Sequence, residues 1–478
     1  MSDVAAARVP PVPPATTAPA IAPERGFTQL EYQLNDYPGP TKTALFGIQH
    51  VLVMFTAMVG GPLIVARLLN LSPAVRIEMV TGTMIGCGIA TMISALGLGF
   101  IGPRLPIVMG VFYIFIGPIV AISKDVSLAA AMTALMIGGL VQFAWSPLIG
   151  KMQRFFPAIV TGTTILLIGT GLMKIGINVA TGLNTPSFGT PLTLGLATLM
   201  IVLIIILSVY AKGFIRTLSL FVTMVIGYLT SAALGLLNFQ TVADASWVAV
   251  PNPLPYGGLQ WPGLIGVITV IVCFFATAVE TTGHTLAVCR ITGVPGEDWR
   301  VRGAVSNDGL GSVISALFGG MALTSYSQNI GVISLTGVGS RFVVAAGGAF
   351  LIVMAMIPKV GAIIALMPSA VLGGVLLFMF GMVASVGLDI IGKNLKSRRD
   401  ALIVASSLAV GLGIQAAPPA AFDAIAPALR ILVTDGIVMG ILLAMFLSIV
   451  SSQGHFPMRS VPATRFSFLP LTGVESIA

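Results

Sequence analysis

The sequence predicts an all-α polytopic membrane protein with about fourteen transmembrane helices arranged as a 7+7 inverted repeat. Only 8% of the 478 residues are charged, 56% are hydrophobic and the mean hydropathy is +1.01. A soluble domain carries about 25% charged residues, so this chain has too little charge to cover a water-exposed globule. The other two observations are a series of span-length apolar stretches and a faint internal repeat.

Apolar stretches of roughly 17–25 residues, the length needed to cross a bilayer as a helix, follow one another along most of the chain. We expect spans near 44–68, 77–99, 106–122, 127–149, 157–175, 191–211, 216–237, 262–288, 302–319, 321–338, 342–365, 369–388, 400–417 and 429–451. Before them lies a Pro/Ala-rich tail (1–43) that we expect to be disordered, and after them a short C-terminal tail (453–478).

The distribution of basic residues orients these spans, because Lys and Arg are enriched in cytoplasmic loops. One side holds thirteen: Arg104, Lys151, Arg154, Lys212, Arg216, Arg290, Arg300, Arg302, Arg341, Lys393, Lys396, Arg398 and Arg399. The other side holds six: Arg67, Arg76, Lys124, Lys174, Lys359 and Arg430. We therefore expect both termini in the cytoplasm, and the loop 238–261, which lacks Lys and Arg, outside.

The internal repeat appears as the segment Ile93-Ser94-Ala95-Leu96, which recurs 221 positions later as Ile314-Ser315-Ala316-Leu317. The same offset relates Gly88 to Gly309 and Gly110 to Gly331. An odd number of spans in each half makes the halves inverted, as in many transporters. Spans 3 and 10 correspond and are interrupted by Gly or Pro, so we expect each to be broken, with a short extended stretch before a half-helix.

Composition also excludes several classes of function. The net charge of +8 is scattered, with no Lys/Arg cluster for nucleic acid, and suits loop orientation instead. The three cysteines (Cys87, Cys273 and Cys289) lie in or beside apolar stretches and give neither a disulfide framework nor a metal site. We expect no metal and no cofactor.

The segment 322–337, in predicted span 10, is unusually polar for its depth. It reads Ala-Leu-Thr-Ser-Tyr-Ser-Gln-Asn-Ile-Gly-Val-Ile-Ser-Leu-Thr-Gly. Polar side chains and irregular backbone in a membrane are tolerated where they are buried in protein or line a cavity. Ser327, Gln328 and Asn329 are therefore candidate binding residues, although hydrogen bonding between helices with no ligand is the alternative.

Predicted span 8 carries the carboxylate Glu280 and, four residues later, His284. Residues four apart share one helix face, so the two form a candidate protonatable pair for a proton relay. The alternative is a structural ion pair between helices. Gly283, between them, suggests that another group approaches closely.

Four further polar residues lie in or beside the predicted spans. Two of them, Asp308 and His50, have two interpretations each, and the other two have one. Asp308 is either part of a relay or, in Asn307-Asp308-Gly309, a turn at the cytoplasmic end of span 9. His50, next to Gln49 in span 1, is more often a structural hydrogen-bonding residue than a ligand in such a setting. Asp435 and Glu78 begin spans 14 and 2, where a carboxylate stabilises the helix dipole.

These groups together suit a small planar solute. Gln and Asn side chains offer a donor and an acceptor that match an amide or imide edge, and a carboxylate accepts from ring N–H groups. Phe112 and Tyr113 in span 3 offer aromatic faces for stacking. A small, hydrogen-bond-rich and roughly neutral heterocycle is therefore the expected ligand.

At these residues the sequence resembles the nucleobase–ascorbate transporter family, also called nucleobase–cation symporters. The segment Gln328 to Gly337 resembles the family signature Gln/Glu/Pro-Asn-x-Gly-x-x-x-x-Thr-Arg/Lys/Gly, which includes Gly331 and Thr336. Gln49-His50 is similar to its first-span pair, Glu280-x-x-Gly283 to its eighth-span motif, and Asp308-Gly309 to its ninth-span pair. The match runs from about residue 44 to 452.

The resemblance implies a core domain (44–150, spans 1–4, and 241–365, spans 8–11) and a gate domain (151–240, spans 5–7, and 366–452, spans 12–14). It also implies proton-coupled uptake by an elevator-like movement, commonly as a homodimer, here in the plasma membrane, which would be a bacterial inner membrane. Glu280 and Gln328 would hold the base and Asn329 would shape the site. Asp308 and His50 would support coupling and geometry.

The resemblance also bears on the substrate. Gln328, Thr336-Gly337 and Asp308 are similar to the xanthine and uric acid branch, whereas the uracil branch usually has Glu at position 328. His284 looks like the uracil branch, because purine transporters usually have Asp there, and Ile330 differs from the Asn common in the xanthine branch. An oxidised purine is therefore favoured, with uracil as the alternative.

Two other classes of function fit less well. An anion transporter of the sulfate-permease type would share the fold but should place a cation near spans 3 and 10, and span 10 has no Lys or Arg before Arg341. It would usually also carry a cytosolic C-terminal domain in place of the short tail 453–478. A membrane-embedded enzyme needs a catalytic cluster or metal ligands, and the chain has three histidines in all.

Overall fold

The computed structural model describes residues 30–149, 157–326 and 328–452, and nearly all of its regular structure is helical. The long helices are α1 (Pro40–Leu68), α2 (Pro73–Leu96), α4 (Leu128–Trp145), α6 (Ala158–Ala180), α7 (Pro191–Tyr210), α9 (Ser219–Ala233), α11 (Leu264–Ile291), α12 (Asp298–Leu317), α14 (Arg341–Ala355), α16 (Ser369–Asn394), α17 (Arg398–Ala416) and α19 (Gly436–Ser452). The short elements are β1 (Met109–Val111), η1 (Tyr113–Phe115), α3 (Ile116–Asp125), η2 (Ser146–Leu148), α8 (Gly213–Thr217), α10 (Gln240–Asp244), β2 (Leu323–Ser325), α13 (Gln328–Thr336), α15 (Pro358–Ala365), η4 (Pro419–Phe422) and α18 (Pro427–Val433).

Within these described ranges, eight helices are long and apolar enough to cross a membrane, or nine if the bent pair α14–α15 counts as one span. The protein is therefore a multi-pass membrane protein. Local sequence sets several helix starts: proline occupies the first turn of α1, α2 and α7, where its missing N–H has no helical partner in any case. Ser397 and Asp400 form a reciprocal capping box at the start of α17.

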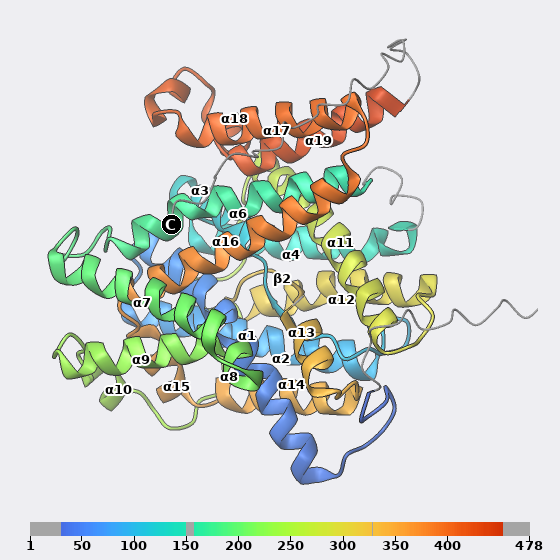
Figure 1. The fold of residues 1–478 in the computed structure, drawn as a ribbon. Helices are drawn as coiled ribbons and strands as arrows, with labels where there is room; N and C mark the ends of the chain where they lie inside the picture. Colours follow the sequence, from blue (N-terminus) through green and yellow to red (C-terminus); the bar gives the residue numbers. More distant parts are fainter. Residues whose placement is uncertain (1–29, 150–156, 327, 453–478) are drawn as a thin grey trace, which may run out of the picture.

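The strongest packing contacts divide most of the long helices into two groups. In the first group, α2 packs against α12 and α14, α4 packs against α11 and α12, and α1 packs against α14. In the second group, α16 packs along α6 and α7, and α17 packs against α19 and α6. In Figure 1 α17, α18 and α19 lie along one edge of the molecule, whereas α1, α2 and α14 lie toward the opposite edge.

Glycines allow the closest helix crossings in the first group. A Cβ on Gly88 of α2 would lie 2.7 Å from the carbonyl oxygen of Gly348 in α14. In the same way, a Cβ on Gly309 of α12 would lie 2.6 Å from the carbonyl oxygen of Gly139 in α4. Only a residue without a Cβ lets these backbones approach so closely.

Two predicted spans are broken where continuous helices were expected. Residues 342–365 form α14 and α15, whose axes differ by 86°. Pro358, at the first position of α15, cannot continue a helix from α14 because it lacks an N–H. Arg76 donates to the carbonyl oxygen of Ala365 at 3.4 Å and Arg67 donates to that of Met367, so two guanidinium groups hold the end of α15.

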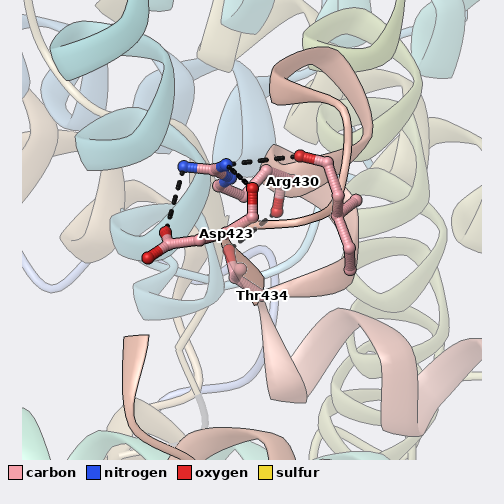
Figure 2. Close-up of polar contacts among 4 residues, drawn as sticks. Asp423, Arg430 and Thr434 are labelled. Carbon is pink, nitrogen blue, oxygen red and sulfur yellow. Dashed lines mark hydrogen bonds and ion pairs between the residues drawn. The ribbon is translucent and has the colours of Figure 1, made fainter. Parts of the chain in front are cut away.

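The predicted span 429–451 is likewise divided into α18 and α19. Asp435 lies at the division, and its Oδ1 accepts from the backbone N–H groups of Ile437 and Val438, as expected for a carboxylate at a helix N-terminus. Figure 2 shows the segment before it, where Arg430 donates to the carbonyl oxygen of Asp423 at 2.8 Å and forms an ion pair with its carboxylate at 3.5 Å.

The first described residues pack against the rest of the chain. Tyr32 pairs with Val338 in a β-bridge, and Arg341 donates to the side chain of Asn35 at 2.9 Å. Residues 30–43, which we expected in a disordered tail, are therefore part of the fold. The remaining tail residues, 1–29 and 453–478, lie outside the described residues.

One residue correspondence predicted from the internal repeat, that of Gly110 with Gly331, is wrong. Gly110 lies in β1, whereas Gly331 lies in α13, so the two are not equivalent. The connection from α2 to β1 covers residues 97–108, whereas that from α12 to β2 covers only 318–322. The offset of 221 therefore holds through the ends of α2 and α12 and is lost before the strands, since the first connection is longer.

Candidate functional site

A short two-stranded sheet lies at the centre of the first group of helices. β1 and β2 run antiparallel, with Gly110 opposite Thr324, and all six strand residues are buried. β1 leads through η1 into α3, and β2 leads into the half-helix α13. Extended backbone is acceptable at this depth because the strands satisfy each other's hydrogen bonds.

Close packing around the sheet depends on glycine. A Cβ on Gly110 would lie 2.4 Å from the ring of Tyr326, whose hydroxyl donates to the carbonyl oxygen of Val111 at 2.9 Å. Gly60 of α1 similarly makes room for the hydroxyl of Tyr113, which donates to the carbonyl oxygen of Ala57 at 2.6 Å. The two phenols therefore fix β1 between α1 and β2.

The aromatic pair predicted to stack on a solute is nearly covered. Phe112 and Tyr113 are 6% and 7% exposed, and the hydroxyl of Tyr113 is bonded to α1. The ring of Tyr113 meets that of Phe380 in α16 edge-on, with centroids 5.2 Å apart. Tyr113 thus contributes to packing between the two helix groups, and only a small part of either ring is free to meet a ligand.

Glu280, on α11, has little hydrogen bonding of its own. Its carboxylate accepts one long bond, 3.5 Å, from Thr324 of β2, and it forms no ion pair with any described residue. A carboxylate has room for about four hydrogen bonds, so most of its acceptor capacity is unused.

A chain of hydroxyl groups connects Glu280 to a second carboxylate. Thr281 donates to Asp308 Oδ2 at 2.5 Å and lies 3.3 Å from the hydroxyl of Thr324, which also contacts Glu280. Ser325 donates to Thr281 at 3.1 Å. Because the proton of Thr281 is directed at Asp308, the single proton of Thr324 has two acceptors, Thr281 and Glu280.

Asp308 lies in the interior of α12 and is completely buried. The alternative of a turn at the end of span 9 is therefore wrong, since the Asn-Asp-Gly sequence is helical here. Its Oδ1 is buried without a hydrogen-bonding partner among the described atoms. Thr281 is thus the main contact of this carboxylate.

Glu280 and His284 do not bond to each other in the described structure; they bond to successive residues of β2. His284 Nδ1 lies 3.0 Å from the carbonyl oxygen of Ser325 and 3.2 Å from its hydroxyl. A carbonyl oxygen only accepts, so Nδ1 carries a proton. The expected close approach at Gly283 is absent, because a Cβ there would meet no described atom within 4 Å.

Asn329 and His50 join the half-helix α13 to α1. The amide nitrogen of Asn329 lies 3.0 Å from His50 Nδ1 and donates to the backbone carbonyl of His50 at 3.1 Å. An amide nitrogen only donates, so Nδ1 of His50 accepts and the proton of its neutral ring lies on Nε2. The side-chain oxygen of Asn329, Oδ1, is buried and has no hydrogen-bonding partner among the described residues.

The remaining predicted residues differ in whether their side chains form hydrogen bonds to described residues. Gln328, the first residue of α13, and Gln49 are half-buried, and neither side chain is bonded to a described residue. Gly331 faces open space. Thr336 donates to the carbonyl oxygen of Val332 at 2.8 Å, within the last turn of α13. Ser327 lies outside the described residues.

Sequence reasoning missed the hydroxyls of Thr281, Thr324 and Ser325. Thr281 directly follows Glu280, and Thr324 and Ser325 lie four and three residues before Gln328 in the polar segment 322–337. Their place in that segment was the available signal, but only pairing of β1 with β2 brings Thr324 to α11.

Comparison with known proteins identifies relatives over most of the chain. A family model described as "Permease family" matches residues 41–420. The uric acid transporter UacT of Escherichia coli is 33% identical over 379 residues, which are 78% of each chain. The uric acid permease PucJ of Bacillus subtilis is 32% identical over 419 residues, 86% of this chain and 93% of that protein. The xanthine permease of the same species is 31% identical over 411 residues, with coverage of 86% and 93%.

Solved structures show a related fold. The transmembrane domain of a cyanobacterial bicarbonate transporter, BicA, matches with a TM-score of 0.57 and 18% identity, over 88% of this chain and all of that one. The murine solute carrier 26 family member A9 anion transporter, in its inward-facing state, matches with a TM-score of 0.61 and 13% identity, over 88% of this chain and 69% of that one. At such identities the likeness concerns the fold alone. The match to the family model, together with relatives above 30% identity, shows that this chain belongs to the nucleobase–ascorbate transporter family of permeases, which are transporters and not enzymes.

Proposed function

We propose that the protein is a secondary active transporter that takes up a nucleobase together with a proton, and that the solute is an oxidised purine such as xanthine or uric acid. The observation that carries the proposal is the unused hydrogen-bonding capacity of the Glu280 carboxylate. It is a carboxylate among membrane helices with one long hydrogen bond and no ion pair in the described structure. An ionisable group in this setting is costly and marks a substrate or ion pathway.

A planar heterocycle rich in N–H groups completes that bonding. Its N–H groups donate to Glu280, while the free amide of Gln328 offers both a donor and an acceptor to the ring's carbonyl edge. α13, which carries Gln328 and Asn329, packs against both α1 and α11. Asn329 is held by His50, so we assign it to shaping the site, with Gln49, Gly331 and Ser327 as further candidates for its lining.

The hydroxyl chain supplies a coupling route. Thr324 has one proton and two acceptors, Glu280 and Thr281, and Thr281 in turn bonds to Asp308. A change in the protonation or ligand bonding of Glu280 thereby changes the hydrogen bonds available to Asp308. We assign proton coupling to this chain, with His284 adjusting β2 through Ser325.

The movement we propose is elevator-like, with the first group of helices (44–150 and 241–365) as the core and the second (151–240 and 366–452) as the gate. Support comes from contacts that occur once in each half of the chain's repeat. The crossing of α2 with α14 at Gly88 corresponds to the crossing of α12 with α4 at Gly309, and β1 pairs with β2. Such pairs suit fourteen spans in a 7+7 inverted repeat. We expect a homodimer in the plasma membrane with both termini cytoplasmic.

Two alternatives remain for the solute. The names of the relatives and Gln328 favour a purine, whereas His284 resembles the uracil branch, so a uracil–proton symporter is the second candidate. The structural neighbours include an anion transporter, but α13 contains no Lys or Arg to hold an anion.

Uptake measurements test the proposal. Cells that lack their own nucleobase permeases and express this protein should accumulate labelled xanthine or urate more than labelled uracil. Uptake should fall when a protonophore dissipates the proton gradient. A well-expressed protein at the cell surface that takes up none of the three solutes would refute the assignment.

A further inference from the structure

A cavity of about 200 Å³ lies beside α2, apart from β1 and β2. Its wall comprises Ile77, Glu78 and Thr81 of α2, residues 249–252 and Pro255 of the 238–261 loop, Phe318 at the end of α12, and Ala355 and Pro358 at the bend between α14 and α15. The loop 238–261 lacks Lys and Arg, so the charge distribution places this cavity on the outer side.

The loop that forms one wall is fixed to the helices beneath it. Ala249 donates to the carbonyl oxygen of Met356 at 3.1 Å, and Leu254 donates to that of Leu317 at 2.7 Å. The hydroxyl of Tyr256 donates to the carbonyl oxygen of Gly319 at 3.0 Å. These bonds at both ends of the lining segment make the cavity a built feature and not a gap under a loose loop.

Glu78 is the charged group of this cavity, and its place in the helix is not explained by the dipole. α2 begins at Pro73, so Glu78 is its sixth residue and lies beyond the first turn, where the dipole acts. The expectation that Glu78 serves as a dipole partner is therefore wrong. Its carboxylate is half-buried and accepts no hydrogen bond from the described residues.

The basic residue nearest to Glu78 in sequence, Arg76, and the one at the bend between α14 and α15, Lys359, form hydrogen bonds to other groups. Arg76 donates to the carbonyl oxygens of Leu71 and Ala365, at 3.3 and 3.4 Å. Lys359 donates to the carbonyl oxygens of Val242 and Ala243, at 2.8 and 3.1 Å. Glu78 therefore keeps its full acceptor capacity for something that enters the cavity.

The groups that line the outer cavity match in kind those of the central site. Glu78 corresponds to Glu280, the side-chain amide of Asn252 to that of Gln328, and the ring of Phe318 offers the aromatic surface. Drug-sized ligands occupy pockets of about 300–1,000 Å³, so 200 Å³ suits a smaller planar molecule. Phe318 is also the first residue of the short connection to β2, which leads to the central site.

We propose that this cavity is an outer capture site, at which Glu78 accepts hydrogen bonds from the N–H groups of the same planar solute before it reaches Glu280. The proposal rests on the proposed function for the identity of the solute. A capture site raises the local concentration of solute, so it acts on uptake at low concentration and not on the maximal rate.

The first experiment is an uptake titration with labelled urate or xanthine on Glu78→Gln. We expect the half-saturation concentration to rise about 3- to 10-fold while the maximal rate stays within twofold, because glutamine keeps one acceptor oxygen and loses only the charge that strengthens the solute's hydrogen bond at the entrance. Asp244→Asn, a carboxylate of the same loop outside the cavity, is the matched control and should behave as wild type. Asn252→Ala, at an exposed position, should raise the half-saturation concentration less.

The second experiment measures equilibrium binding of labelled urate to purified full-length protein. We expect Glu280→Gln to keep a weak binding phase that the double variant Glu78→Gln/Glu280→Gln lacks. The capture site alone would be overturned if Glu78→Gln had the half-saturation concentration of the wild type. It would also be overturned if Glu280→Gln bound no urate while the wild type transports it. A wild-type protein that neither binds nor transports a nucleobase would overturn the proposed function, and the capture site with it.

Discussion

Replacing Thr281 with Val tests the hydroxyl chain most directly. The Thr281 hydroxyl donates to Asp308 Oδ2, accepts from Ser325 and contacts Thr324. Since Asp308 Oδ1 is already without a partner in the described structure, the valine leaves this buried carboxylate with no hydrogen bond of normal geometry to a described residue. Valine keeps the shape of the side chain and removes only the hydroxyl.

The expected loss follows from the energy of one bond. A hydrogen bond to a charged group contributes about 1.5–3 kcal/mol, which corresponds to about 10- to 150-fold in an equilibrium constant. We expect uptake of the preferred nucleobase, at concentrations below half-saturation, to fall by about this factor. Uptake would be measured per molecule at the cell surface, alongside the melting temperature of the purified protein.

Thr285→Val is the matched control. Thr285 lies one turn further along α11, is equally buried, and donates only to the backbone carbonyl of Thr281 at 2.7 Å. It should retain most of the uptake. Thr281→Val with uptake within twofold of wild type, or an equal loss in both variants, would refute the hydroxyl chain as a functional connection.

The remaining predictions concern the ligand groups and the packing of the sheet. Glu280→Gln should abolish transport without lowering the melting temperature, because this carboxylate has one long hydrogen bond to lose; wild-type uptake would exclude it from binding. Gln328→Glu should shift competition from purines toward uracil, and an unchanged competition profile would exclude it from selectivity. Gly110→Ala should lower stability by about 1–3 kcal/mol, since its Cβ would lie 2.4 Å from the Tyr326 ring, whereas Gly195→Ala, with no described atom within 4 Å, should not; equal melting temperatures would contradict this packing.

Much of the molecule was predictable because the membrane imposes simple rules. A long apolar stretch with few charges has to be a helix in lipid, so the positions of α1, α2, α6, α7 and α11 follow closely from hydropathy. The polar segment 322–337 stood out for the same reason. The candidate residues Glu280, Gln328, Asn329 and His50 were identifiable as polar side chains in apolar surroundings.

Other features depended on contacts between distant segments. The bend between α14 and α15 was not predicted, because an apolar stretch around Pro358 looks continuous in hydropathy. The failed repeat match at Gly110 and Gly331 has a similar origin, since loop lengths before the two strands differ. Asp308 was interpreted equally as part of a proton relay and as a turn at the cytoplasmic end of span 9, because Asn-Asp-Gly is also a turn sequence.

That the chain is a multi-pass membrane protein with a polar segment in span 10 follows from residue type and position, because these alone set the energy of placing polar groups in lipid. Which polar groups meet depends on contacts between distant segments. Pairing of β1 with β2 sets Thr324 between Glu280 and Thr281, and it directs His284 to Ser325 instead of to Glu280. Such pairings depend on strand register and helix crossing, which no local pattern of residues specifies.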